Sequence, residues 1–322
     1  MKIIITGSLG NISHPLAAEL VQKGHAVTVV SSKPDKKKLI EDLGAIPAIG
    51  TLEDTGFLSE TFAGADAVYC MLPPYNYMDP NLDFMETTRQ LMDSYKSAIL
   101  QSGVKQVVHL SSVGAHMDSG NGLLRFHHLA EQIFQTLPST VSVTHMRPVG
   151  FYNNLYNFID LIKGKGFLGR LLALCFYGFW NLVTGKKGII LSNYGGSDPA
   201  VMVSPGDIAT AIVEELTVPA PGRKIRYVAS DEMTCNDVAT ALGKAIGKPY
   251  LKWARVSDKR MLSSLQSFHI PPEIAKEMVE MNAGNRSGII YEDYYRHKPA
   301  KLGKVKLADF AREFNTVYQQ KA

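Results

Sequence analysis

Short apolar runs alternate with amphipathic segments through the first half of the chain. Strands are expected at residues 1–6, 26–30, 45–49, 67–72, 106–110 and 141–146. One helix is expected to follow residue 13, and others are expected at residues 36–43, 55–62, 80–102 and 124–137. Strands that alternate with helices in this way are typical of parallel sheets, because a helix carries the chain back to the start of the next strand. The pattern therefore predicts an α/β fold with a doubly wound parallel sheet.

The alternation fails beyond residue 151. Helices are expected at residues 208–216, 236–246 and 272–281, and one more strand is expected at residues 225–228. We therefore expect a core over residues 1–150 and a smaller, mainly helical C-terminal lobe over residues 151–322. This lobe is expected to be interleaved with the core and to carry an apolar helical insertion at about residues 160–184.

The first strand ends in a glycine turn that runs directly into a helix. The residues of this turn are Gly7, Ser8, Leu9, Gly10, Asn11, Ile12 and Ser13. A strand, a glycine turn and a helix N-terminus together bind the pyrophosphate of a dinucleotide. Ser13 stands where a third glycine is usual, and serine is small enough for the helix to pack closely on the strand. The alternative is a tight turn that merely needs a positive φ angle.

The second strand ends in polar residues, Ser31, Ser32 and Lys33, with Lys36–Lys38 shortly after. An NAD site usually has an acidic residue at this tip, which binds the ribose 2′-hydroxyl. Hydroxyls and an ammonium suit a 2′-phosphate instead, and Asp35 comes two residues too late. We therefore expect NADP(H) to be favoured over NAD(H). A solvated, lysine-rich helix start is the alternative.

Composition excludes several classes of function. The formal charge of +4 comes from scattered residues, so no nucleic-acid partner is expected. Cys70, Cys175 and Cys235 lie far apart without metal-ligand spacing, which predicts buried free thiols and no metal site. The N-terminus has no signal-peptide pattern. A soluble cytoplasmic protein is expected.

Residues 167–183 form a strongly apolar stretch that contains Arg170. The stretch is at the short limit for a membrane span, and a span here would divide the fold across a bilayer. We expect a helical lid, a wall of a substrate pocket, or a contact with a second copy or another protein. No membrane span is expected.

Several landmarks fall in a characteristic order. They are the turn at residues 6–13, Gly50–Asp54, the proline-ended fourth strand, Gly103–Gly114, His127–Glu131, Arg147–Asn154 and Val203–Ala209. Together they resemble the NmrA-like branch of the atypical short-chain dehydrogenase/reductase superfamily, over roughly residues 1–250. The resemblance implies a dinucleotide-binding Rossmann core. It adds to the expected cofactor contacts Leu72, Pro73, Ser111, Ser112, His127, Pro148 and Phe151.

The resemblance also exposes a departure in the catalytic residues. Short-chain dehydrogenases typically place a Tyr-x-x-x-Lys pair on the helix after the fifth strand. Here that helix begins Leu124-Arg125-Phe126-His127-His128-Leu129-Ala130-Glu131 and has neither residue. The remaining candidates are His127, which shares a helix face with Glu131, and Ser112, which matches the serine that polarises a carbonyl. The alternatives are a structural His127–Glu131 hydrogen bond and a serine that caps a turn.

The family contains both reductases and non-catalytic redox sensors. A conjugated acceptor can take a hydride first and its proton from solvent, so a missing tyrosine is tolerable for a quinone reductase. We therefore expect an NAD(P)H-dependent oxidoreductase acting on a quinone or conjugated carbonyl, with Phe151, Tyr152 and the apolar stretch forming a flat pocket for a small apolar or aromatic substrate. The alternative is a sensor that binds NAD(P) and acts through a protein partner.

Overall fold

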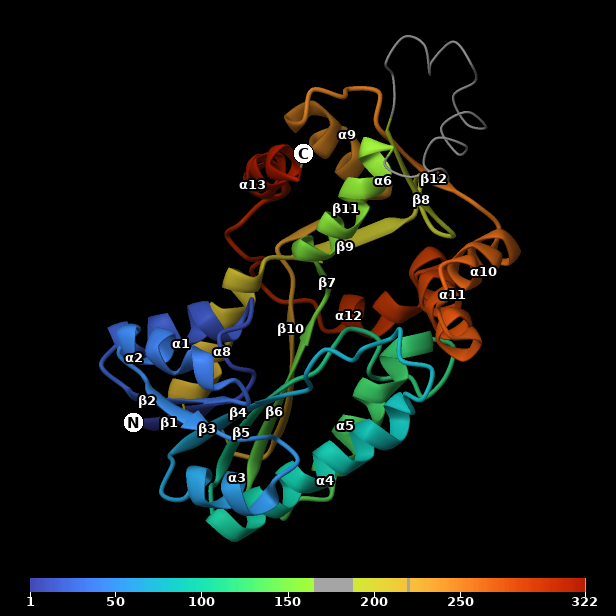
Figure 1. Ribbon diagram of the computed structural model, residues 1–322. Helices are drawn as coiled ribbons and strands as arrows, with labels where there is room; N and C mark the ends of the chain where they lie inside the picture. Colours follow the sequence, from blue (N-terminus) through green and yellow to red (C-terminus); the bar gives the residue numbers. More distant parts are fainter. Residues whose placement is uncertain (165–187, 219–220, 322) are drawn as a thin grey trace.

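The computed structural model describes residues 1–164, 188–218 and 221–321 (Figure 1). Their central feature is a seven-stranded sheet in the order β10-β6-β5-β4-β1-β2-β3, in which every neighbouring pair is parallel. Its strands are β1 (Lys2–Ile5), β2 (Ala26–Ser31), β3 (Ile46–Ile49), β4 (Ala67–Met71), β5 (Gln106–Leu110), β6 (Ser142–Pro148) and β10 (Arg223–Val228). The chain order reverses at β1, as the doubly wound prediction requires.

Helices cover both faces of this sheet because successive strand residues point to opposite sides. Ile3 and Ile5 pack with helices α1 (Ser13–Gln22) and α8 (Pro205–Thr217), and Ile4 packs on the other face. That second face is covered by α3 (Thr55–Phe62), α4 (Phe84–Ser102) and α5 (Arg125–Gln135). Both layers are visible in Figure 1. The remaining helical segments of the core are η1 (Pro34–Lys36), α2 (Lys37–Asp42) and η2 (Gly122–Leu124).

Strand β6 is longer than the sequence indicated. The strand was expected to end at residue 146, but Arg147 and Pro148 also lie in β6, where Pro148 is the register partner of Val228 in β10. The expectation was wrong because β10 comes from far along the chain and extends the ladder beyond residue 146. It also means that a strand of the 151–322 segment completes the sheet of the first 150 residues.

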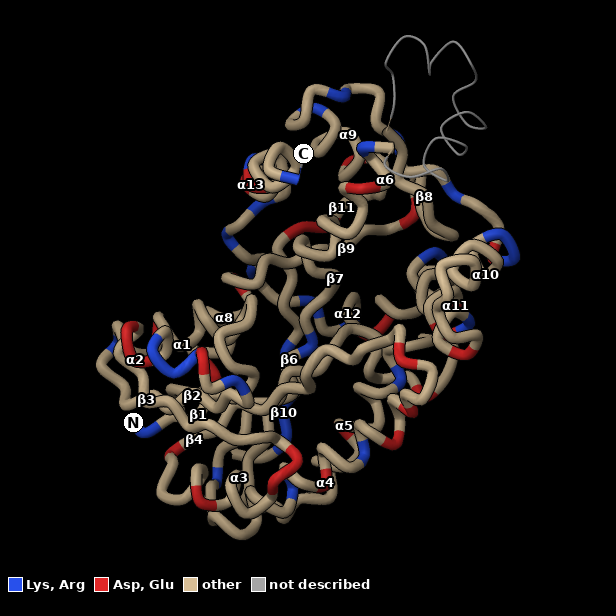
Figure 2. The backbone as a smooth tube through the Cα atoms, in the orientation of Figure 1, with Lys and Arg blue, Asp and Glu red and all other residues tan. Residues whose placement is uncertain are grey.

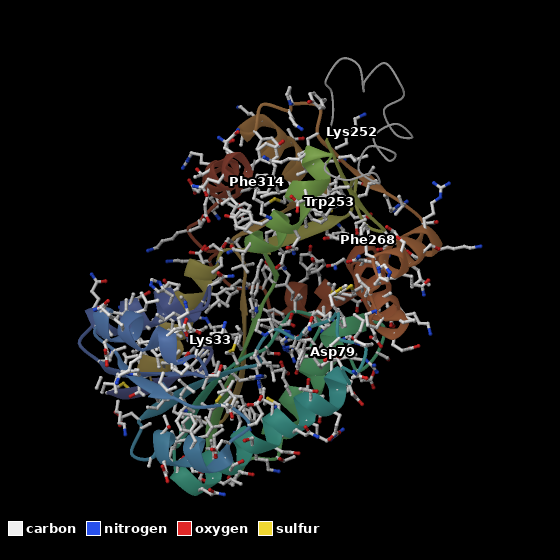
Figure 3. All side chains as sticks on the ribbon, in the orientation of Figure 1. Lys33, Asp79, Lys252, Trp253, Phe268 and Phe314 are labelled. Atoms are coloured by element: carbon white, nitrogen blue, oxygen red, sulfur yellow. The ribbon has the colours of Figure 1, made fainter. Side chains whose placement is uncertain are left out.

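The C-terminal lobe contains strands as well as helices, and the sequence pattern predicted none of the strands that form its two small sheets. They are β7 (Gly150–Phe151), β8 (Ile189–Ser192), β9 (Pro199–Val203), β11 (Asp231–Thr234) and β12 (Lys252–Arg255). They form two small sheets, β11-β9-β7 and β12-β8. The lobe's helical segments are η3 (Tyr152–Phe158), α6 (Ile159–Lys163), α9 (Cys235–Ala245), α10 (Asp258–Ser267), α11 (Pro272–Ser287), η4 (Ile289–Tyr291), α12 (Glu292–Arg296) and α13 (Leu307–Gln320). Trp253 and Phe314, labelled in Figure 3, belong to its buried core.

Asp207 connects the two parts of the molecule. The hydroxyl of Ser204, not Asp207, caps helix α8 by accepting a hydrogen bond from the Asp207 N–H. The Asp207 carboxylate instead accepts hydrogen bonds from the N–H groups of Lys304 (3.0 Å) and Val305 (3.1 Å) and from the Ser230 hydroxyl (2.6 Å). It thereby holds the segment that leads from α12 to α13.

The described residues bear on the expectations about a membrane span, a metal site and the cysteines. None of their helices is long and apolar enough to cross a membrane. They contain no group of three or more His, Cys, Asp or Glu residues that could hold a metal ion. Cys70 and Cys235 are buried free thiols, as predicted, whereas Cys175 and the apolar stretch 167–183 lie outside the described residues. Acidic and basic residues are interspersed along the backbone (Figure 2).

Candidate functional site

The turn after β1 is held in a left-handed conformation that leaves its outer side open. Gly7 has φ +89° and Ser8 has φ +56°. A larger residue would be strained at this φ angle, and its Cβ atom would also lie 2.8 Å from the sulfur of Met71 and 3.1 Å from Oγ of Ser13, so the Met71 side chain would have to move. The Ser8 N–H donates to the Val30 carbonyl (2.9 Å), which fixes the turn against the end of β2. A glycine turn fixed in this way between a strand and a helix has the form of a dinucleotide-binding turn.

Helix α1 starts at the end of this turn without a side-chain cap. Ile12 occupies the N-cap position, and no side chain accepts a hydrogen bond there from the helix N–H groups. The Ser13 hydroxyl donates to the Thr6 carbonyl (3.1 Å), so it joins the helix to β1. The His14 N–H donates to the Gly10 carbonyl (3.0 Å) and Pro15 has no N–H, so the helix presents chiefly the positive end of its dipole to the turn. The geometry fits the pyrophosphate of a dinucleotide.

The residues at the tip of β2 divide into a buried and an exposed group. Ser31 is buried, and its hydroxyl lies 2.9 Å from that of Ser8 and accepts from the Lys33 N–H (3.2 Å). Ser32 and the side chain of Lys33 are exposed, at the tip of β2 next to the turn (Figure 3). Ser31 therefore shapes the loop, whereas Ser32 and Lys33 remain available to a ligand.

The end of β4 is anchored below the same edge of the sheet. The Thr6 hydroxyl accepts from the Met71 N–H (3.1 Å), and the Tyr95 hydroxyl donates to the Met71 carbonyl (3.0 Å). Leu72 is buried in the apolar cluster beside α4, and Pro73 is half-buried. At Leu72 only the backbone remains for a ligand, because its side chain is in the core.

Ser111 and Ser112 follow β5 directly, and they have different surroundings. Ser111 is buried and donates its hydroxyl hydrogen to the carboxylate of Glu131 (2.5 Å). Ser112 is half-buried, and its hydroxyl has no hydrogen-bond partner among the described residues. Of the two, Ser112 is the serine that can donate a hydrogen bond to a bound molecule.

His127 lies in the first turn of α5, with its ring 4.1 Å from that of Phe126. Its Nδ1 has no hydrogen-bond partner in the part of the chain that the structure describes. Burial lowers the pKa of His127 to about 4, and the nearby Glu131 carboxylate acts in the opposite direction. The imidazole is therefore neutral at pH 7, with one ring N–H to donate.

The expected alternative of a His127–Glu131 hydrogen bond does not occur in the structure, because Glu131 is engaged by Arg147. The Arg147 guanidinium donates to both carboxylate oxygens, from Nε (2.9 Å) and Nη2 (2.6 Å). Arg147 is only 4% exposed and Glu131 only 6%. The sequence did not indicate this pair, because the strand was expected to end at residue 146 and an arginine just beyond it does not indicate a buried strand position.

The aromatic wall expected from Phe151 and Tyr152 is wrong for Tyr152. Tyr152 is fully buried, stacks on Phe310 at 5.0 Å and donates to Asp231 (2.6 Å). Its ring belongs to the core of the C-terminal lobe. Phe151 is half-buried in the short strand β7, and Pro148 is buried in β6.

The NmrA-like family matches the chain over residues 1–302. The chain belongs to the NmrA-like family. Its resemblance to this family was evident from the order of its motifs, and the match extends beyond the 250 residues that carried them.

Solved structures with the same fold cover almost all of this NmrA-like chain. An NADPH-dependent quinone oxidoreductase of Escherichia coli, solved with NADPH, has a TM-score of 0.73 at 17% identity and covers 97% of this chain and 99% of its own. The triphenylmethane reductase of Citrobacter sp. has a TM-score of 0.72 at 17% identity, over 98% and 100% of the two chains. A nucleoside-diphosphate-sugar epimerase of Staphylococcus aureus has a TM-score of 0.73 at 13% identity, over 97% and 100%. At these identities the likeness is one of fold.

One curated relative matches part of this NmrA-like chain. It is 4-hydroxy-2-methyl-3-oxo-4-farnesyl-3,4-dihydroquinoline-1-oxide ketoreductase of Stigmatella aurantiaca, 25% identical over 143 residues. The match spans 44% of this chain and 42% of that protein, so the chain spans less than half the length of this relative.

Proposed function

We propose that this NmrA-like protein is an NADP(H)-dependent oxidoreductase that reduces a quinone or a conjugated carbonyl compound. The observation that carries the proposal is the open turn at Gly7. Any larger residue would be strained at the positive φ angle of Gly7, and the turn leads into a helix without a side-chain cap. A turn of this kind between a parallel strand and a helix N-terminus is typical of a pyrophosphate site.

The residues at the tip of β2 favour NADP(H) over NAD(H). Ser32 and Lys33 are exposed there, and the strand ends without a carboxylate to bind a ribose hydroxyl. Lys33 has no ion-pair partner among the described residues, so its ammonium is available to a 2′-phosphate.

The chemistry divides between the cofactor and the chain. When bound, the reduced nicotinamide supplies a hydride to the acceptor. The chain's own contribution is to hold and polarise the acceptor oxygen, for which Ser112 can donate its hydroxyl hydrogen and His127 its ring N–H. Because the pKa of His127 is about 4, the imidazole acts as a hydrogen-bond donor and not as an acid at pH 7. The acceptor oxygen then takes its proton from water, which a conjugated acceptor tolerates.

The reductases among the compared proteins support this proposal. The Escherichia coli enzyme acts on quinones, the Citrobacter enzyme on triphenylmethane dyes, and the Stigmatella enzyme is a ketoreductase. The epimerase has the same fold, but helix α5 here has neither the tyrosine nor the lysine of the usual short-chain dehydrogenase pair.

The test is to titrate the purified protein with NADPH and NADH, and then to follow NADPH oxidation against a panel of quinones and conjugated aldehydes. We expect saturable oxidation that requires an acceptor. Gly7→Ala should weaken NADPH binding about tenfold or more, because alanine is strained at positive φ and its Cβ meets Met71. Gly206→Ala is the matched control, since a Cβ there has only Ser204 Oγ nearby, at 3.9 Å.

The outcomes separate the proposed enzyme from a sensor. Tight NADPH binding without oxidation of any acceptor would favour a non-catalytic redox sensor that acts through a protein partner. Failure to bind either nucleotide would overturn the interpretation of the turn itself.

A further inference from the structure

A buried ion network links the two candidate catalytic residues to the C-terminal lobe. Arg147 donates from Nη1 to the carboxylate of Asp293 in α12 (2.9 Å) and to the hydroxyl of Tyr227 in β10 (3.1 Å). Tyr227 in turn donates to Asp293 (2.6 Å). With its two bonds to Glu131, Arg147 joins β6, α5, β10 and α12 in one cluster.

Glu131 is the point at which this cluster reaches the candidate site. Its carboxylate accepts three hydrogen bonds, one from Ser111 and two from Arg147. Ser111 is adjacent in sequence to Ser112, and His127 lies one helical turn before Glu131 on α5. His127 is therefore one turn away from the carboxylate that Arg147 holds, and Ser112 is adjacent to the serine that donates to this carboxylate.

The backbone around Ser112 is fixed by the same neighbours. The Ser111 N–H donates to the Met146 carbonyl (2.8 Å), and the Val113 N–H donates to the Pro148 carbonyl (2.9 Å). Both acceptors flank Arg147 in β6. The Ser112 segment thus lies against the strand that carries the arginine.

Stability alone does not account for a buried ion pair of this kind. Removing two charges from water costs several kcal/mol per ion, and replacing a buried pair by apolar residues is often neutral or stabilising. A pair that gains little stability but fixes one arrangement of α5, β5 and α12 suits a positioning role. Arg147 and Glu131 also line a cavity of about 550 Å³.

We propose that Arg147 is a positioning residue, which holds Glu131 and thereby aligns the hydroxyl of Ser112 and the imidazole of His127 for the acceptor. This inference rests on the proposed function. It adds to it a residue that acts on Ser112 and His127 through Glu131.

The experiment compares Arg147→Met, the double variant Arg147→Met/Glu131→Gln and Arg147→Lys. Arg147→Met leaves a buried carboxylate without its partner, so it is expected to be destabilised. The double variant removes this charge at residue 131, and Asp293, the other partner of Arg147, keeps the Tyr227 hydroxyl (2.6 Å) and His297 (3.2 Å) as neighbours, so the double variant is expected to unfold at a denaturant concentration closer to that of the wild type than Arg147→Met does. Its kcat should nevertheless fall about 100-fold with an unchanged KM for NADPH, because a misplacement of about 1 Å has that effect. Arg147→Lys should restore part of the kcat.

Arg226→Met is the matched control. Arg226 lies in β10 at the edge of the same sheet and pairs with Glu215 (2.8 Å), but it contacts neither Glu131 nor Ser111. It should lose stability without a change in kcat. A double variant with wild-type kcat would overturn the positioning role.

A second measurement does not depend on turnover. Amide hydrogen exchange at residues 111–113 and in α5 should be faster in the double variant than in the wild type, at equal global stability. Unchanged exchange in these segments would overturn the proposal. If the wild type binds NADPH but oxidises no acceptor, the proposed function fails, and the exchange measurement still decides whether Arg147 positions these residues.

Discussion

The stability of the protein should fall steeply at mildly acidic pH because of two histidines in its core. His109 in β5 and His145 in β6 are register partners and are fully buried, and their Nδ1 atoms are 3.0 Å apart. Neither Nε2 has a hydrogen-bond partner among the described residues. One Nδ1 must donate to the other, which is possible only while at least one ring is neutral.

The direction of the effect follows from the pKa shifts. Burial lowers the pKa of His145 to about 3, and burial together with the neighbouring His145 lowers the pKa of His109 well below its usual value. In the unfolded chain both groups titrate near the ordinary value of about 6.5. The stabilising contribution of the neutral pair is therefore complete above pH 6.5, and it is lost as the pH falls from 6.5 towards the folded pKa.

The size of the loss is set by the gap between the two pKa values. One pH unit within this gap corresponds to about 1.4 kcal/mol per group, so His145 alone lowers the free energy of unfolding by about 2 kcal/mol between pH 6.5 and pH 5. His109 acts in the same direction. Total stabilities are only about 5–15 kcal/mol, so the effect is measurable.

The assay is urea unfolding, followed by circular dichroism, between pH 7.5 and pH 5. The double variant His109→Leu/His145→Leu removes both partners together and leaves no unpaired ring nitrogen. Between pH 7.5 and pH 5 its free energy of unfolding should fall by a smaller amount than that of the wild type, and the difference should be at least about 2 kcal/mol. The control is His14→Ala, because His14 is exposed on α1. Equal losses in the wild type and the double variant would refute the argument.

Three further substitutions test other parts of the structure. Gly122→Ala should lower the free energy of unfolding by about 3 kcal/mol, because its Cβ would lie 2.0 Å from a backbone carbonyl oxygen of α11. The control is Gly120→Ala, whose Cβ would have its nearest contact at 3.5 Å and which should lower the free energy of unfolding by less in the same urea titration. Asp207→Ala should destabilise the protein by about 2 kcal/mol or more and speed amide exchange in the segment leading to α13, since three donors lose their acceptor. Lys33→Ala should weaken NADPH binding about tenfold and leave NADH binding unchanged. The control is Lys38→Ala, on the following helix, which should alter the binding of neither nucleotide. Equal weakening of NADPH and NADH binding by Lys33→Ala would contradict the assignment of the 2′-phosphate site.

The parts of the candidate site that were predictable from the sequence are contiguous in the chain. The turn at residues 7–13 and the polar tip at residues 31–33 were located from their residues alone, and the structure gives them an open helix start and an exposed lysine. Helix α3 was expected at the bounds that it has, because Asp54 is a good N-cap and the apolar period of residues 55–62 is clear. In each case the residues that indicate the element are neighbours in the sequence.

The C-terminal lobe was harder to predict for a physical reason. Its strands β8 and β12 pair with each other although some 60 residues separate them, and each has only four residues. Four residues are too few for an alternating pattern to stand out. Tyr152 was misread because an aromatic residue near a site has the same sequence signal as one in a core.

The sequence by itself determined the family, the parallel α/β core and the position of the glycine turn, because strand period, glycine positions and helix faces are local properties. Tertiary structure decided that Arg147 lies in a strand and pairs with Glu131, that β10 completes the sheet, and that Asp207 holds a segment about a hundred residues away in the chain. These contacts join residues whose own neighbours in sequence do not indicate them. A buried charge is stabilised only by the partner that the fold brings to it, so its role becomes visible only when that partner is in place.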